Sequence, residues 1–252
     1  MTVILKYTYL KTMDWLKKKL RNLYYFFYDG KIVKLKGYKH LEKSSWILDK
    51  NFGRAYYTGA YEPEICEFLL KNLKKNSVFV DVGAHAGYFS LFASKLCENG
   101  SVYSFEPSDS NYRYVLKIKN LNNVSNLKIF NVGVGEKQGV LFFSQGKTSS
   151  TGKINDNGDV KVEIVALDKI LEDVAKIDLM KIDVEGFGAK VLAGAYNILE
   201  KKSPLILMEI HNTEEMNAAK DLEKYGYELY DFKTNEKLLN NNFQPFIIAK
   251  KD

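Results

Sequence analysis

Cysteine is scarce in this sequence of 252 residues, which contains only Cys66 and Cys97 and no C-x-x-C spacing. We therefore expect neither a zinc site nor a disulfide framework. A reducing, cytoplasmic compartment fits such a sequence best. No apolar run approaches the length of a membrane span. Repeats and low-complexity segments are also lacking, so one globular domain with a small appendage is the simplest organisation.

A strong excess of either charge is lacking too. The sequence has 37 basic and 31 acidic residues and a formal net charge of +6. This mild basicity permits a nucleic-acid partner but does not indicate one, because the lysines are scattered or concentrated near the N-terminus.

The first 30 residues are not a signal peptide, because lysines interrupt their apolar stretches and no small-residue cleavage site follows. They predict a basic amphipathic helix, whose apolar residues are Trp15, Leu16, Leu20, Leu23 and Phe27. Such a helix can lie on an anionic membrane surface, making the protein peripheral to it, or pack against this domain or a second subunit. Residues 31–50 alternate in polarity and predict a hairpin.

The rest of the chain is organised around residues 77–90, which read SVFVDVGAHAGYFS. A short apolar strand leads to Asp81, two glycines follow at Gly83 and Gly87, and a helical run begins at Tyr88. A strand, a glycine turn and a helix N-terminus together predict a site for a nucleotide-like ligand, since glycines admit close approach and the first helical turn leaves N–H groups unpaired. The alternative for the glycines is a plain tight turn.

Two acids indicate which ligand. Asp81 would repel a pyrophosphate but attract an ammonium or sulfonium group, and the turn lacks the middle glycine of the dinucleotide fingerprint. Glu106, followed by Pro107, ends the next strand, where a carboxylate can accept both ribose hydroxyls. Together the two acids favour S-adenosylmethionine (SAM), a charged nucleoside without phosphates.

Strands and helices alternate from residue 62 onward, which predicts a parallel sheet with right-handed crossovers. The expected fold is α/β and Rossmann-like. It has a mostly parallel seven-stranded sheet, helices on both faces and an antiparallel edge strand. The predicted strands cover 78–80, 101–105, 126–132, 177–183, 204–210, 227–232 and 243–249. Residues 51–62 and the polar stretch 144–159 are predicted to be loops.

Ligands of such sheets lie beyond the carboxyl ends of the strands. Asn131 ends the third strand, Asp183 and Glu185 follow the fourth, and Glu209 and His211 follow the fifth. Acids and a histidine at consecutive strand ends indicate a functional site. Helix capping is the alternative for Asp183 and for Asn212, the residue after His211.

Five segments together resemble the FkbM-type SAM-dependent methyltransferases: DVGAHAGYFS (81–90), VYSFEPSDSNY (102–112), VALDKI (165–170), KIDVEGFGAKVLAGA (181–195) and MEIHN (208–212). A weaker match is YTGAYE, residues 57–62. Gly188 departs from the family, which more often has a charged or larger residue there, and we expect this departure to affect helix packing rather than chemistry. The resemblance implies a class I methyltransferase fold, with an N-terminal extension over 1–56 and the methyltransferase domain over 57–252.

The resemblance also implies site roles. Asp81, Gly83 and Gly87 would hold the methionine end of SAM, Glu106 the ribose, the region of Asn131 the adenine, and Asp183 would lie near the methyl group. The expected cofactor-binding residues are Asp81, Gly83, Ala84, Gly87, Glu106, Pro107, Asn131 and Asp183.

A hydroxyl acceptor needs a base, and His211 is the best-tuned candidate at neutral pH, with Asp183 and Glu185 beside it as catalytic residues. Glu185 and Glu209 are rivals for the role of base, and the alternative for His211 is a structural histidine that holds a loop. The expected substrate-binding residues are Glu209, Tyr57 and Glu62. Asp183, Glu185 and Glu209 could offer oxygen ligands to Mg²⁺, but the D-x-E spacing is weak and we expect no metal.

The expected function is therefore SAM-dependent O-methylation of a hydroxyl on a sugar, glycan or other small molecule. Two alternatives stay open at this point. An RNA methyltransferase would show RNA binding with a steep salt dependence. A non-catalytic binding protein could keep the fold alone, although the acids at 81, 106 and 183 argue against it.

Overall fold

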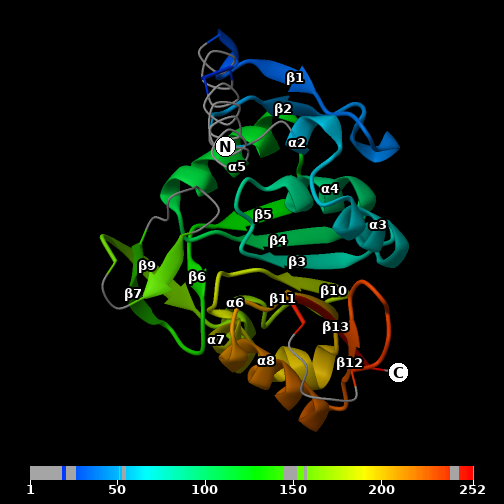
Figure 1. Cartoon of the computed structure of the whole chain (residues 1–252), viewed down its shortest axis with the longest axis vertical. Helices are drawn as coiled ribbons and strands as arrows, with labels where there is room; N and C mark the ends of the chain where they lie inside the picture. The colour runs from blue at the N-terminus through cyan, green and yellow to red at the C-terminus, as the bar shows by residue number, and fades with distance from the viewer. Residues whose placement is uncertain are drawn as a thin grey trace, which may run out of the picture. The chain divides into compact units, whose positions relative to one another are not determined.

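The computed structural model describes residues 19–20, 27–50, 52, 55–144, 152–155, 158–238 and 244–251. The chain divides into two compact units, Met1–Tyr61 and Glu62–Asp252. The ribbon of Figure 1 follows both units from the N-terminus to the C-terminus. Most of the predicted N-terminal helix lies outside the described residues, so that helix stays a prediction. In the part of the chain that is described, no helix is both long and apolar enough to cross a membrane.

The first unit contains the predicted hairpin. Strand β1 (Ile32–Lys34) pairs antiparallel with β2 (Ser45–Ile47), with Val33 opposite Trp46, and the short helix η1 (Lys39–Leu41) lies between them in sequence. The segment predicted to be a loop over 51–62 instead contains a short helix, α2 (Ala55–Thr58). Aromatic packing holds this helix. The ring of Tyr56 stacks on Trp46 at 5.6 Å and on Tyr61 at 4.0 Å between centroids.

The second unit contains the predicted seven-stranded sheet, in the order β12-β13-β11-β10-β3-β4-β5. Strands β5, β4, β3, β10 and β11 are parallel, while β13 is antiparallel to both of its neighbours. The Rossmann-like fold class is confirmed. The antiparallel strand, however, lies one place in from the edge, because the last strand of the chain inserts between β11 and β12. The strands of this sheet are β3 (Val78–Val82), β4 (Ser101–Phe105), β5 (Leu127–Phe130), β10 (Leu179–Ile182), β11 (Leu205–Glu209), β12 (Glu228–Asp231) and β13 (Phe246–Lys250).

Helices cover both faces of this sheet. Val80 and Val82 of β3 pack with the apolar residues of the later helices, such as Val191 and Met216. The side chain of Asp81 points the other way and meets Ser90 of α4. Central parallel strands are buried on both faces, which explains their continuous apolar runs. The helical segments are α3 (Pro63–Asn72), α4 (Tyr88–Leu96), α5 (Asp109–Leu121), α6 (Leu167–Ile170), α7 (Gly188–Ala193), η2 (Ile198–Lys202), α8 (Thr213–Lys220) and η3 (Asp221–Tyr225).

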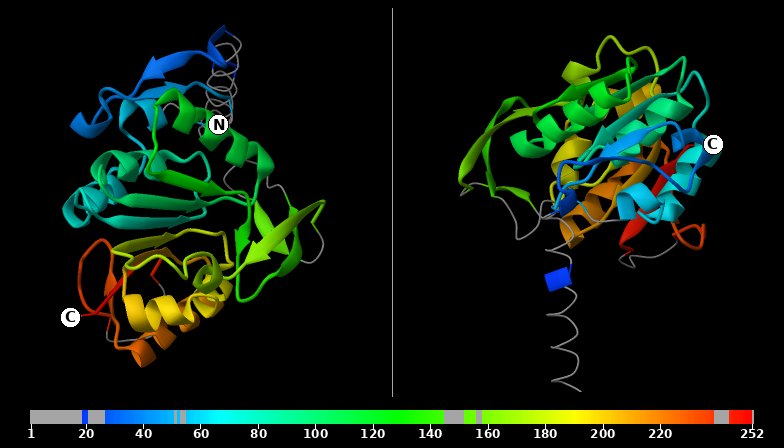
Figure 2. Two further views of the ribbon diagram at one scale, coloured as in Figure 1. Left: turned by 180° about the vertical axis from the view of Figure 1, so that it is seen from behind. Right: turned by 90° about the horizontal axis from the view of Figure 1, so that it is seen from above.

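A second, four-stranded sheet lies beside the main one and was not predicted as such (Figures 1 and 2). Its order is β6-β9-β7-β8. It has a small core of its own, built on Phe143, Val162 and Ile164. The segment predicted to be a polar loop over 144–159 supplies β8, while 145–151 and 156–157 lie outside the described residues. The strands are β6 (Gly133–Val134), β7 (Gly139–Ser144), β8 (Lys153–Asn155) and β9 (Val160–Val165).

Candidate functional site

The glycine turn after β3 packs directly against the loop after β10. Gly83 has φ +85°, and a Cβ atom there would lie 1.8 Å from the carbonyl oxygen of Asp183. Gly87 has φ +74°, and a Cβ there would lie 2.6 Å from Val115 of α5. Both glycines are thus required by backbone conformation and by close packing within the protein. The contact at Gly83 brings the predicted cofactor loop and the predicted catalytic loop together.

Glu106 fixes the shape of the glycine turn from the end of β4. Its Oε2 accepts a hydrogen bond from the backbone N–H of His85 at 2.8 Å, and its Oε1 accepts one from Ser108 at 2.9 Å. His85 has φ +48°, a left-handed conformation that costs a non-glycine residue about 1–3 kcal/mol. Burial raises the pKa of Glu106 to about 7, so the carboxyl exchanges its proton near neutral pH.

The other predicted cofactor residues lie around these two. Ala84 is buried, and its N–H donates to the carbonyl of Phe105 at 3.0 Å. The side-chain amide of Asn131 donates to the backbone carbonyls of Glu106 and Pro107, at 3.0 and 3.2 Å. Asn131 therefore holds the 106–107 segment in place. Its sequence-predicted place near the adenine stays a prediction.

Asp81 belongs to a buried row of polar side chains that runs across three strands. In the sheet register it lies opposite Ser104 of β4 and Lys181 of β10. Directly opposite residues point to the same face, so the three side chains meet. Ser90 donates to Asp81 Oδ2 at 2.6 Å, and Ser104 donates to Ser90 at 2.7 Å. Asp81 Oδ1 is buried and accepts no hydrogen bond from any residue that the structure describes.

Lys181 is the buried positive charge of the site, with 2% of its surface exposed. Its Nζ donates to Asp183 Oδ2 at 2.9 Å. Burial alone would lower the pKa of Lys181, but the carboxylates of Asp183 and Asp81 raise it above its usual range, so it stays charged. The charge of Glu62, at the start of α3, also raises the pKa of Lys181. The Glu62 carboxylate therefore acts on the same buried ammonium. Lys181 is not among the site residues predicted from the sequence.

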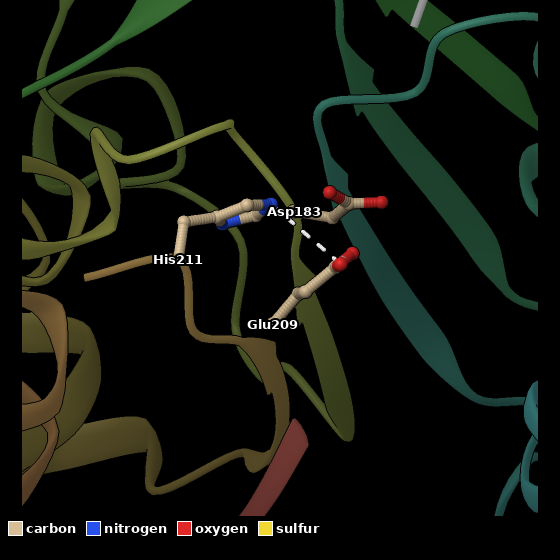
Figure 3. A group of neighbouring side chains, drawn as sticks. All are labelled: Asp183, Glu209 and His211. Atoms are coloured by element: carbon tan, nitrogen blue, oxygen red, sulfur yellow. Dashed lines mark ion pairs between the residues drawn. The ribbon is translucent and has the colours of Figure 1, made fainter. Parts of the chain in front are cut away.

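The side chains of Asp183, Glu209 and His211 point toward one another at the ends of β10 and β11 (Figure 3). One ligand atom from each lies within 4.8 Å of the others, so the group could hold a metal ion. Burial and the nearby Asp183 raise the pKa of Glu209 to about 8. Burial would also raise the pKa of Asp183, but the Lys181 ammonium lowers it below its usual range. At neutral pH, Glu209 therefore carries a proton and donates it in a hydrogen bond to the Asp183 carboxylate.

His211 is surrounded by carboxylates. Its Nε2 lies 3.7 Å from Glu185 and 3.6 Å from Glu209, and its Nδ1 lies 3.5 Å from Glu215. The neighbouring Glu215 contributes most to raising the pKa of His211 above 6.5, and Glu209 and Glu185 add to the effect. Such an imidazole is a stronger base than an isolated one and exchanges a proton near neutral pH.

The loop after β10 adopts a strained conformation that sets the position of Glu185. Glu185 has φ +52° and Gly186 has φ +101°. Asn212, which follows β11, donates from Nδ2 to the carbonyl of Gly186 at 3.3 Å and caps α8 by accepting from Glu215 N–H at 2.8 Å. The two strand-end loops are thus tied together. Asn212 does serve as a cap, while Asp183 pairs with Lys181.

Most of the predicted site residues therefore lie at one end of the sheet, in two joined groups. Tyr57 is the exception, because it belongs to the first unit, and its contact with substrate stays a prediction. Glu215 was missed by the sequence analysis as completely as Lys181. A signal for it was present, since Asn212 and Glu215 have the spacing of a helix cap and its third helical residue.

The chain is similar to known methyltransferases. A family model, Methyltransferase FkbM domain, matches residues 81–233, more than half of the chain. The chain belongs to the FkbM methyltransferase family. Membership confirms the family expected from the sequence motifs, and a methyltransferase family agrees with SAM as the cofactor. The FkbM match begins at Asp81, so the weaker YTGAYE resemblance at 57–62 falls outside it.

Two relatives of the chain are methyltransferases by name. The chain is 24% identical over 155 residues to the hexuronic acid methyltransferase AglP of Haloferax volcanii, which covers 60% of this chain and 62% of AglP. It is 25% identical over 162 residues to methyltransferase sdnD of Sordaria araneosa, which covers 50% of this chain and 62% of sdnD. The chain thus spans about three fifths of the length of these relatives. Among solved structures, precorrin-6y C5,15-methyltransferase of Geobacter metallireducens matches with a TM-score of 0.46 and 14% identity, over 76% of this chain and 90% of that chain.

Proposed function

We propose that this protein is a SAM-dependent O-methyltransferase that acts on a hydroxyl of a sugar, glycan or other small molecule. The observation that carries the proposal is the convergence of His211, Asp183 and Glu209 at the ends of β10 and β11. The backbone contact between Gly83 and Asp183 joins this group to the glycine turn of the family match. A donor site and a base next to each other are what methyl transfer to a hydroxyl requires.

The residues present fit SAM. Asp81 Oδ1 is a buried acceptor without a hydrogen-bond partner among the described residues, which suits an ammonium group. Glu106 is a carboxylate at the end of the second strand, where ribose hydroxyls can donate to its remaining lone pairs. We expect Asp81, Gly83, Ala84 and Gly87 to hold the methionine end and Glu106, with Pro107 and Asn131, the nucleoside end. When bound, SAM supplies an electrophilic methyl group.

The proposed chemistry of the chain is a proton transfer. A hydroxyl becomes a competent nucleophile only as its proton leaves, and we assign that proton to His211 Nε2. Glu185 lies 3.7 Å from that nitrogen, and its carboxylate stabilises the imidazolium that forms, while the protonated Glu209 lies 3.6 Å from the same nitrogen. Asp183, held by Lys181, keeps a negative charge beside this group.

The hexuronic acid methyltransferase AglP suggests a class of acceptor. A hexuronic acid offers two kinds of oxygen, the hydroxyls and the carboxylate. A carboxylate is already deprotonated and would be repelled by Asp183 and Glu185, so the geometry favours a hydroxyl. The product would then be an ether, which survives mild alkali, whereas a methyl ester would be hydrolysed.

The test is a transfer assay with SAM bearing a labelled methyl group, offered with neutral sugars, uronic acids, glycans and RNA. We expect alkali-stable label in a sugar or small molecule, and loss of that label with His211→Ala. His40→Ala is the matched control, because His40 is exposed and lies in the first unit. Label in RNA alone would contradict the proposal. SAM binding with transfer to none of these acceptors would favour the non-catalytic alternative.

We also propose, from sequence, that the N-terminal segment makes a peripheral contact with an anionic membrane or a second copy of the chain. Lysines and aromatic residues alternate there, and Leu20 and Phe27 are exposed. Co-sedimentation with vesicles containing anionic lipid, compared between the full chain and one lacking residues 1–30, tests the first alternative. Sedimentation of the full chain alone would support membrane contact, and equal pelleting would exclude it. A difference in oligomeric state would support self-association.

A further inference from the structure

Glu215 is a fully buried carboxylate on the first turn of α8, and none of the roles described so far uses it. We propose that Glu215 is a positioning residue for His211, which fixes the imidazole so that Nδ1 carries the proton and Nε2 is left as the base. This inference rests on the proposed function, because it gives His211 a task only if a base is needed. The contacts of the two carboxylate oxygens of Glu215 point to this role.

Each oxygen of Glu215 is tied to a different loop of the site. Oε1 accepts from the backbone N–H of Gly188 at 2.7 Å, at the start of α7. Oε2 accepts from the backbone N–H of His211 at 2.7 Å and lies 3.5 Å from His211 Nδ1. One carboxylate therefore holds the backbone of His211, lies beside its ring, and links both to the loop that carries Asp183 and Glu185. His211 Nδ1 is buried and has no hydrogen-bond partner among the described residues, so Glu215 Oε2 is placed to accept a proton-bearing Nδ1.

Gly188 explains how the carboxylate fits there. A Cβ atom at this position would lie 2.4 Å from Met208 Cε and 2.8 Å from Glu215 Oε1. The glycine that departs from the family pattern thus makes room for Glu215 and donates a hydrogen bond to it. Sequence analysis assigned this departure to helix packing rather than to chemistry. The structure places it one hydrogen bond from the residue that holds His211.

A buried carboxylate is costly unless it is hydrogen-bonded and paired. The backbone donors and His211 together lower the pKa of Glu215 below its usual range despite its burial. A helix cap alone does not account for this arrangement, because Asn212 already caps α8 and an apolar side chain could fill the same volume.

The orientation of the ring follows from the charges that face it. Glu215 faces Nδ1, whereas Glu185 and Glu209 face Nε2, and Asp183 adds its negative charge from β10. At neutral pH Glu209 is a hydrogen-bond donor to Asp183, and Glu185 lies on the Nε2 side of the ring at 3.7 Å. Glu215 is therefore the carboxylate that faces Nδ1, at 3.5 Å. An imidazole bonded to that carboxylate through Nδ1–H presents the lone pair of Nε2 to the acceptor hydroxyl.

The experiment is an NMR titration of the whole chain labelled with ¹⁵N in its histidines. The sequence has three histidines, so few signals need assignment, and His211→Asn identifies the one of interest. In the wild type we expect the neutral His211 ring to be protonated at Nδ1. In Glu215→Gln we expect the pKa of His211 to fall by roughly one unit or more, as an anionic partner is lost. Glu214→Gln is the matched control, because this neighbour on α8 is exposed.

Two outcomes would overturn the inference: a neutral ring protonated at Nε2 in the wild type, or an unchanged His211 pKa in a folded Glu215→Gln. The wild-type tautomer decides the question even if the variant does not fold. Kinetics separate this inference from the proposed function. We expect Glu215→Gln to lower kcat with unchanged SAM binding and to move the acidic limb of the pH profile to lower pH. Full transfer by His211→Ala would contradict the proposed base while leaving the NMR coupling intact.

Discussion

The site has two halves, at the ends of β3 and β4 and at the ends of β10 and β11, and their carboxylates have different partners. On the β3–β4 side, Glu106 accepts hydrogen bonds from two backbone N–H groups and Asp81 accepts one from Ser90. On the β10–β11 side, Asp183 and Glu209 face each other, and three carboxylates surround His211. Backbone donors favour the ionised form of Glu106, although burial raises its pKa to about 7, whereas facing carboxylates must share protons. We propose that the first half orients a ligand and that the second half moves a proton.

The largest expected effect tests the second half. His211→Ala should lower the rate of methyl transfer by about 10²- to 10⁴-fold, the usual range for a lost general base. SAM binding should stay unchanged, and His40→Ala should change neither. The wild-type rate should fall as the pH drops below the pKa of His211, which its carboxylate neighbours raise above its usual range, because protonation removes the base. Glu209 titrates nearby, so the apparent values belong to the group. A methyl-transfer rate that does not change between pH 6 and 9 would contradict a proton transfer in the second half of the site.

Lys181 joins the two halves, since its ammonium faces Asp81 on one side and Asp183 on the other. Lys181→Met should destabilise the protein by roughly 3–5 kcal/mol, because it leaves buried carboxylates without their counter-charge. Chemical denaturation measures this free energy of unfolding. The matched control is Lys75→Met, whose partner Glu98 lies at the surface 2.9 Å away. Exposed pairs contribute about 0–1 kcal/mol. Similar losses for the two variants would show that the buried row is not the link we describe.

The two halves also differ in how well the sequence predicts them. The first half is local in sequence, so a strand, an acid and two glycines predict the turn, and Glu106 follows at the next strand end. The second half depends on register. Nothing in the order of residues places Lys181 opposite Asp81, a pairing that only the alignment of β3 with β10 creates.

The same reason explains Glu215 and the short helix α2. Glu215 acts on His211 and Gly188, and the contact with Gly188 needs α7 and α8 to pack together. Helix α2 forms where glycine and aromatic residues predicted a loop, since Tyr56 is buried between Trp46 and Tyr61. Long-range packing overrides local preference in both cases. The seven strands were predictable because their apolar runs need no partner to be recognised.

A smaller effect tests the first half. Glu106→Ala should weaken SAM binding by roughly 1–3 kcal/mol, as hydrogen-bonding groups in the site lose their acceptor. Calorimetric titration measures this change. Binding to the wild type should weaken as pH falls below about 7, where the buried Glu106 takes up a proton. If one proton is taken up, the affinity for SAM can fall by at most about tenfold per pH unit. Glu106→Gln removes the titrating group and should bind SAM equally at pH 6 and 8. If it retains the wild-type slope, another group titrates.

The smallest expected effect concerns a divalent metal ion in the second half of the site. Asp183, Glu209 and His211 are close enough to share a divalent cation. That cation would have to displace the Lys181 ammonium from Asp183 and the proton from Glu209, which already balance the charges. We therefore expect methyl transfer by chelator-treated protein to equal that of untreated protein. Loss of activity on treatment, restored by Mg²⁺ or Mn²⁺ in the wild type but not in Asp183→Asn, would contradict this. The facing carboxylates of the second half would then be metal ligands rather than partners in a proton transfer.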